Sequence, residues 1–140
     1  MNARTIYIVD DNNEFRQSTR WWLEGAGYDV VDFADPTVAL RSLTADGAAH
    51  AQACVLLDVR MPGMSGIELG GKLREQAIPF LFLSAYGDQE IVRQAADEGA
   101  LGYLVKPLDI QQIVPSIEAA LTRAAEIRKL RESEAQLNAA

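Results

Sequence analysis

The sequence predicts an α/β domain whose central five-stranded parallel sheet is doubly wound, with helices on both faces. Apolar runs of strand length recur along the chain, and they are continuous rather than alternating, which is typical of strands buried on both faces. Helical patterns separate these runs, and strands that alternate with helices form right-handed βαβ crossovers. Four of the runs end on a polar or charged side chain. This fold would therefore gather those side chains at one edge of the sheet.

The first half of the chain carries clear signals for its strands and helices. A first helix is expected from about Glu14 to Glu24, because Gly25-Ala26-Gly27 is a typical helix stop. A second helix should begin at Asp35-Pro36, where an N-cap acceptor is followed by a proline at the first helical position. Together with the second half, the sequence predicts five strands, at about residues 5–10, 28–33, 54–58, 79–84 and 101–106.

Three more helices are predicted in the second half of the chain, which makes five in all. Ser65 begins the third, because Glu68 lies at the spacing of a capping box. The fourth should open near Asp88 and end before Gly99, and the fifth should open near Asp109.

The fifth helical pattern is unusual in two respects. Pro115 lies inside it, where proline removes a backbone donor, so we expect a kink or a restart there. The pattern also continues past the length of a domain helix, with apolar spacings that average about 3.4 residues, close to the coiled-coil repeat. The alternative is a helix end that frays in solvent. The positions concerned are Ile113, Ile117, Leu121, Ala124, Ile127, Leu130 and Leu137, with Glu134 in the one gap.

This pattern divides the chain into two parts. Residues 1–122 are expected to form the globular domain, and residues 123–140 a helical extension. We expect residues about 117–137 to pair with a second copy as a parallel two-helix coiled coil, because an isolated helix of this length is marginal in water.

Composition and charge narrow the class of protein. At 140 residues with 49% hydrophobic content, the chain is sized for one globular domain. The net charge of −7 argues against direct nucleic-acid contact by these residues, and no apolar run reaches the length of about 20 residues that a membrane span needs. The single Cys54 excludes an internal disulfide and a cysteine metal cluster. No signal-peptide pattern precedes the first strand, so a cytoplasmic protein is expected.

The polar side chains at the strand ends form a candidate site for a metal ion and a phosphoryl group. Asp10 and Asp11 follow the first strand, Asp58 ends the third, Ser84 the fourth and Lys106 the fifth. Three carboxylates in one crevice repel unless a cation screens them. Oxygen ligands without His or Cys favour Mg²⁺ over Zn²⁺. Taken alone, Asp10-Asp11 would be interpreted as a solvated turn, and Lys106 as a surface lysine at a strand end.

Asp58 is the candidate nucleophile of this site, since a carboxylate can carry a phosphoryl group. Catalysis of phosphoryl transfer consists mainly of positioning and of neutralising charge. Mg²⁺ and Lys106 would neutralise the phosphoryl oxygens, and Ser84 would donate a hydrogen bond to one of them. The bond between Lys106 and Pro107 is a candidate cis peptide, which would aim the lysine inward.

These motifs resemble the signature of bacterial response-regulator receiver domains, over residues about 4–122. The matching segments are Asp10-Asp11, the DVRMPGMSG run from Asp58 to Gly66, Ser84-Ala85 and Lys106-Pro107. The resemblance implies the flavodoxin-like strand order 2-1-3-4-5. It also implies that Asp58 is the phosphoacceptor, which receives its phosphoryl group from a histidine kinase. The run after Asp58 resembles a variant common in regulators of transcription, which favours gene regulation as the output.

The resemblance also assigns roles to the neighbours of Asp58. Asp11 and Asp58 would bind Mg²⁺ directly, with the backbone carbonyl of Arg60, and Asp10 would act through a metal-bound water. Ser84 and Tyr103 occupy the positions of the family's switch residues, which would report phosphorylation on the surface of helix 4, strand 5 and helix 5. Arg60 and Tyr86 would flank the phosphoryl group and control the access of water to it.

Two other classes of function compete with a phosphorylation switch. A metal-dependent phosphatase or phosphotransferase with an aspartate nucleophile commonly has an acid two residues after it, but Arg60 stands there. A phosphorylation-independent interaction domain would not need the complete set of acceptor, metal ligands, hydroxyl and lysine. The sequence therefore favours a phosphoacceptor domain over an enzyme, and it leaves the output open between an RNA-binding antiterminator, a DNA-binding domain, a sensor or kinase, and none.

Overall fold

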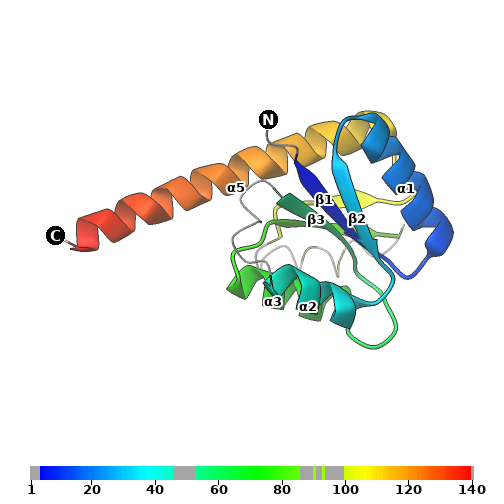
Figure 1. Cartoon of the computed structure of the whole chain (residues 1–140), viewed down its shortest axis with the longest axis horizontal. Coiled ribbons are helices and arrows are strands. Elements are labelled where there is room, and N and C mark those ends of the chain that lie inside the picture. The colour runs from blue at the N-terminus through cyan, green and yellow to red at the C-terminus, as the bar shows by residue number, and fades with distance from the viewer. Residues whose placement is uncertain (1–3, 46–52, 86–89, 91–92, 94–99, 140) are drawn as a thin grey trace.

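The computed structural model describes residues 4–45, 53–85, 90, 93 and 100–139, and the side chains of all of these except 110 and 135–139. Within this part, five strands form one parallel sheet in the order β2-β1-β3-β4-β5, as predicted (Figure 1). The strands are β1 (Thr5–Val9), β2 (Asp29–Phe33), β3 (Ala53–Asp58), β4 (Phe80–Ser84) and β5 (Tyr103–Val105).

Four helices are described, on both faces of the sheet. They are α1 (Asn13–Gly25), α2 (Pro36–Ala45), α3 (Gly66–Glu75) and α5 (Ile110–Ala139). Helices α1 and α5 cover one face, and α2 and α3 cover the other (Figure 1). The fourth predicted helix lies mostly outside the described residues. Of its segment only Glu90 and Arg93 are described, and both are helical.

Local sequence signals set the helix starts where they were predicted. The Asp35 carboxylate accepts a hydrogen bond from the Thr37 amide at 2.8 Å, immediately before α2. Ser65 is the N-cap of α3, and its hydroxyl oxygen accepts from the Glu68 amide at 3.2 Å. Asp109 accepts from the first-turn amide of α5 in the same way. Each of these side chains satisfies a donor that the first helical turn leaves unpaired.

Strand residues alternate between two apolar cores. Ile8, Leu56 and Leu83 face α1 and α5, whereas Val55 and Phe82 face α2 and α3. This alternation follows from the two-residue period of a strand, and because helices cover both faces, the positions of β3 and β4 before their polar last residues are all apolar.

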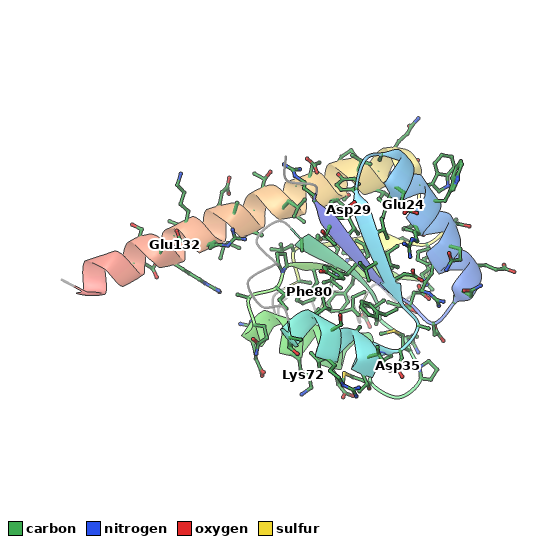
Figure 2. All side chains as sticks on the ribbon, viewed as in Figure 1. Glu24, Asp29, Asp35, Lys72, Phe80 and Glu132 are labelled. Carbon is green, nitrogen blue, oxygen red and sulfur yellow. The ribbon has the colours of Figure 1, made fainter. Side chains whose placement is uncertain are left out.

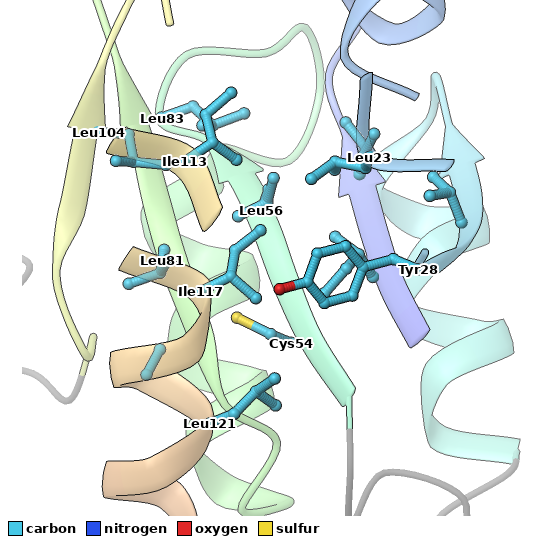
Figure 3. Packing of buried hydrophobic residues seen from close by; sticks show 14 residues of the cluster. Leu23, Tyr28, Cys54, Leu56, Leu81, Leu83, Leu104, Ile113, Ile117 and Leu121 are labelled. Atoms are coloured by element: carbon cyan, nitrogen blue, oxygen red, sulfur yellow. The ribbon is translucent and has the colours of Figure 1, made fainter. Parts of the chain in front are cut away.

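The core beneath α5 contains the single cysteine. Cys54 is fully buried among Tyr28, Ile117 and Leu121 (Figure 3). Burial raises the pKa of its thiol to about 12, so the group remains protonated and packs as a small apolar side chain. On the other face, Phe80 lies between the sheet and the layer of α2 and α3 (Figure 2).

Helix α5 excludes one of the two outcomes that the sequence predicted at Pro115, which were a kink and a restart. It runs without interruption from Ile110 to Ala139, so the helix does not restart at Pro115. The carbonyl that loses its partner there belongs to Gln111, four residues earlier, and Gln111 is exposed. Water can satisfy this carbonyl, which makes the proline tolerable. The later turns extend beyond the sheet, and Leu130 is 64% exposed (Figure 1).

Candidate functional site

The predicted site residues meet at the carboxyl edge of the sheet because their strands are parallel and in register. Val9 of β1 lies beside Leu57 of β3. The residues that follow them in the chain, Asp10 and Asp58, are therefore neighbours. One carboxylate oxygen from each of Asp10, Asp11 and Asp58 lies within 4.8 Å of the others. The edge of the sheet therefore holds three carboxylates in one small volume.

Lys106 supplies the positive charge in this group. Its Nζ lies 2.6 Å from Asp10 Oδ2 and 3.7 Å from Asp58 Oδ2. The same ammonium lies over the ring of Phe15, 4.3 Å from the centroid, which is a cation–π contact. The peptide bond between Lys106 and Pro107 is cis. The lysine at the end of β5 thus points into the acidic cluster.

The three carboxylates differ in their surroundings. Asp10 is fully buried, Asp58 is 8% exposed and Asp11 is exposed. Burial raises the pKa of Asp58 to about 6, and the negative charge of Asp10 adds to this effect. Lys106 and the Arg60 amide, which donates to Asp58 Oδ1 at 3.4 Å, oppose the rise. Asp58 is therefore a carboxylate that the folded chain holds in a crowded, partly desolvated position.

The loop after Asp58 folds back closely onto the end of β3. The Gly66 amide donates to the carbonyl of Val59 at 3.0 Å. A Cβ at Gly66 would lie 1.8 Å from the Asp58 carbonyl oxygen, which is far inside van der Waals contact. Glycine at the first position of α3 thus allows the helix to begin directly against the phosphoacceptor candidate.

The remaining predicted residues lie around this cluster. Ser84 is fully buried at the end of β4, next to β3, and its hydroxyl donates to the carbonyl of Ala85 at 3.0 Å. Tyr103 begins β5 and is 46% exposed. Arg60 is exposed beside Asp58. Tyr86 lies outside the described residues.

Three residues of α1 and the turn before it belong to the site but were not predicted from the sequence. Asn12 donates its amide to Asp10 Oδ1 at 2.9 Å, Phe15 packs under Lys106, and Arg16 donates to the Asp10 carbonyl at 2.9 Å. Of these three, only Arg16 could have been predicted from the sequence as a residue with a buried partner. It shares the inward face of α1 with the buried Thr19 and Leu23, and a charged residue at such a position needs a partner.

The arrangement fits a hard divalent cation. Three carboxylates face the ammonium of Lys106, and burial together with the like charge of Asp10 raises the pKa of Asp58. All candidate ligands are oxygen atoms, which suit Mg²⁺ rather than a thiophilic metal. The residues present therefore match an acidic metal site, next to a lysine that can neutralise further negative charge.

The fold and this site define a phosphoacceptor signalling module. Residues 6–118 match the family model described as "Response regulator receiver domain", and the chain belongs to this family. Receiver domains accept a phosphoryl group from histidine kinases and act as switches of two-component systems, rather than as enzymes with a separate substrate. No helix of the described residues is long and apolar enough to cross a membrane.

Two of the relatives are named as regulators of transcription. The chain is 39% identical over 122 residues to the transcriptional regulatory protein TdiR of Thauera aromatica, covering 86% of this chain and 52% of TdiR. It is 36% identical over 121 residues to the transcriptional regulatory protein FixJ of Bradyrhizobium diazoefficiens, covering 85% of this chain and 57% of FixJ. The chain thus spans about half the length of these relatives.

Solved structures agree with this assignment. The response regulator StyR superposes with a TM-score of 0.79 at 35% identity, over 98% of this chain and 68% of that one. Full-length FixJ from B. japonicum gives a TM-score of 0.81 at 32% identity, over 92% of this chain and 63% of FixJ.

Proposed function

We propose that Asp58 is the phosphoacceptor of this receiver domain and that a phosphohistidine of a histidine kinase is the donor. One carboxylate oxygen of Asp58 would attack the phosphorus, and the P–N bond would break with its electron pair returning to the imidazole. The observation that carries this proposal is the position of Asp58, which is 8% exposed within the cluster of Asp10, Asp11 and Lys106. We place this reaction in the cytoplasm, as its partner and family suggest.

Mg²⁺ is the metal that this donor set favours. Asp11, Asp58 and the backbone carbonyl of Arg60 would hold it, and Asp10 would contact it through a water molecule. The bound ion would add positive charge beside the phosphoryl oxygens. Lys106 would serve the same oxygens from its position 3.7 Å from Asp58 Oδ2. Asp10 would then keep the lysine aimed at the site through their 2.6 Å ion pair.

The experiment is phosphorylation of the chain by a small acyl phosphate in the presence of Mg²⁺, followed by intact mass. One phosphoryl adduct is expected in the wild type and none in Asp58→Asn. Asp29→Asn is the matched control, because Asp29 is an exposed aspartate at the other end of the sheet (Figure 2). An adduct that persists in Asp58→Asn at the wild-type level would disprove the assignment.

We propose that Ser84 and Tyr103 carry the signal to the surface. The Ser84 hydroxyl, which now donates to Ala85, would turn to a phosphoryl oxygen and draw the loop after β4 inward. This would give the ring of Tyr103 room to turn inward, as a shift between two existing populations. Amide resonances of β5 should shift on phosphorylation in the wild type and much less in Ser84→Ala. Equal shifts would exclude Ser84 as the coupling residue.

We propose that Arg60 and Tyr86 slow the loss of the phosphoryl group by hindering the attacking water. Arg60 lies exposed beside Asp58, and its amide contacts the Asp58 carboxylate. Phosphorylated Arg60→Ala should therefore lose its label faster than the wild type. A lifetime that does not shorten would remove Arg60 from this role.

We propose that residues 1–122 act as the receiver and that residues 123–140 pair two chains as a coiled coil. The family match ends at residue 118, and Leu130 exposes 64% of its surface on a helix that runs to Ala139. Burying such a leucine contributes about 1.5–3 kcal/mol before entropy costs. Sedimentation should show a dimer in the micromolar range that Leu130→Gln weakens and Glu132→Gln, on the outer face, does not. A monomer at about 100 µM, phosphorylated or not, would refute the dimer.

Gene regulation is the output that the named relatives support, since TdiR and FixJ are transcriptional regulatory proteins. We propose that this chain serves such an output by a change in its own surface or dimerisation, without touching nucleic acid itself. Its net charge of −7 supports the absence of direct contact with nucleic acid. The chain of 140 residues should therefore show no affinity for duplex DNA in a mobility-shift assay at moderate salt, and retention of the DNA would contradict the proposal.

A further inference from the structure

Asp10 is held at all of its polar atoms. Its amide donates to the carbonyl of Phe33 at 3.1 Å, and its carbonyl accepts from Arg16 Nη1 at 2.9 Å. Its carboxylate accepts from the Asn12 amide at 2.9 Å through Oδ1 and from Lys106 Nζ at 2.6 Å through Oδ2. Since the residue is fully buried, each of these partners is needed to offset the loss of water.

Arg16 is the partner that ties Asp10 to β2 as well as to α1. Besides the Asp10 carbonyl, its Nε donates to Asp32 Oδ2 at 2.9 Å and its Nη2 donates to Asn13 Oδ1 at 3.0 Å. The residue is 9% exposed. Its planar guanidinium thus links the end of β1, the end of β2 and the start of α1. A lysine, with a single point of charge, could not form this fork.

The contact to the Asp10 carbonyl fixes more than Asp10 itself. A peptide unit is planar, so the orientation of this carbonyl sets the orientation of the Asp11 amide and the position of the Asp11 Cα. Asp11 has an exposed carboxylate, and its direction therefore depends on how firmly the peptide unit before it is held. Mg²⁺ demands near-ideal octahedral geometry, which makes it sensitive to the direction of each ligand.

We propose that Arg16 is a positioning residue of the phosphorylation site, which sets the direction of the Asp11 carboxylate by holding the peptide unit between Asp10 and Asp11. The proposal rests on the proposed function, in which Asp11 is a metal ligand. Arg16 itself touches neither the metal nor the phosphoryl group. It acts through the backbone, from the side of the turn that faces α1 and β2.

Arg20 provides a matched control on the same helix. It lies one turn after Arg16, and its Nη1 donates to the other oxygen of the same carboxylate, Asp32 Oδ1, at 2.6 Å. Its other described partner is Glu24. Removing Arg20 therefore takes away the same charge and the same ion-pair partner as removing Arg16, but it leaves the Asp10 carbonyl with its donor.

The test compares Mg²⁺ binding by calorimetry in the full chain for the wild type, Arg16→Gln, Arg16→Lys and Arg20→Gln. Loss of a nearby positive charge by itself should tighten the binding of a cation, so electrostatics and positioning predict opposite signs. We expect both Arg16 variants to bind Mg²⁺ about tenfold more weakly, as for other residues that orient metal ligands. Arg20→Gln should bind as well as the wild type or slightly better.

A second measurement needs neither metal nor phosphodonor. Hydrogen exchange of the Asp11 amide in metal-free protein should be faster in the Arg16 variants than in Arg20→Gln. If Arg16→Gln does not fold, as judged by thermal unfolding, Arg16→Lys carries the test because it keeps the charge. Unchanged or tighter Mg²⁺ binding together with unchanged exchange in the Arg16 variants would overturn the proposal. The assignment of Asp58 is judged separately, by its phosphoryl adduct.

Discussion

The two ends of strand β1 carry charged clusters that are built on opposite plans. At the amino end, Glu118 of α5 accepts from Arg4 and, at 2.7 Å, from the hydroxyl of Tyr28. One guanidinium there meets one carboxylate, and both side chains are more than 40% exposed. At the carboxyl end, three carboxylates share the ammonium of Lys106, and Asp10 is fully buried.

The pKa values of the two clusters reflect this difference. Hydrogen bonds from Arg4 and Tyr28 hold the pKa of Glu118 below its ordinary value, so folding favours the charged form. Burial and the charge of Asp10 raise the pKa of Asp58 instead, so folding disfavours its charged form. The balanced cluster stabilises the fold by joining β1 to α5. The unbalanced cluster costs stability at neutral pH, which is a frequent property of functional sites.

The largest expected effect on the free energy of unfolding comes from removing Lys106, the only ammonium described in the acidic cluster. Lys106→Met leaves the buried Asp10 without its ion-pair partner, and breaking such a pair costs about 3–5 kcal/mol. We expect this loss in the free energy of unfolding by urea, at about pH 8 in Mg²⁺-free buffer. Millimolar Mg²⁺ should restore part of it. If Lys106→Met is no less stable than Arg4→Met, the charged clusters at the two ends of β1 do not differ in their contribution to stability.

A second substitution should stabilise the protein. The pKa of Asp58 in the folded chain, about 6, lies above the ordinary 3.8, so its stabilising contribution is complete below about pH 4 and is lost as the pH rises through 6. Since each pKa unit corresponds to about 1.4 kcal/mol, the ionised group costs up to about 3 kcal/mol at pH 8.

Asp58→Asn should therefore raise the free energy of unfolding by up to about 3 kcal/mol at pH 8 in the absence of Mg²⁺. Near pH 4, where Asp58 of the wild type is protonated, the substitution should change the free energy of unfolding little. The matched control is again Asp29→Asn, at an exposed aspartate outside the cluster. The same gain at both pH values would show that the ionisation of Asp58 is not the cause.

The smallest effect is expected at the amino end of β1. Arg4→Met removes an exposed ion pair, which contributes at most about 1 kcal/mol. Salt screens such a pair, so the difference from the wild type should shrink further in about 1 M salt. A loss that matches Lys106→Met and persists in high salt would indicate that Arg4 and Glu118 form a desolvated pair.

Local signals in the sequence determined the elements and the strand ends of the site. The continuous apolar runs specified buried strands, and the caps at Asp35, Ser65 and Asp109 specified helix starts, because each cap bonds to an amide only two or three residues away. Asp10 and Asp58 could be placed together because parallel strands end at one edge. Of the kink and the restart predicted at Pro115, the restart did not occur, and the exposure of Gln111 that makes this proline tolerable is not a local property.

Only the tertiary structure decided which side chains support the site. Asp32 lies 16 residues from Arg16, so no local pattern could pair them. The same holds for Glu118 and Tyr28, which are 90 residues apart. A charged side chain turned toward a protein interior must find a partner there, since burial removes its water. The sequence by itself determined that Arg16 needed such a partner, and the packing of α1 against β1 and β2 determined that the partners were Asp10 and Asp32.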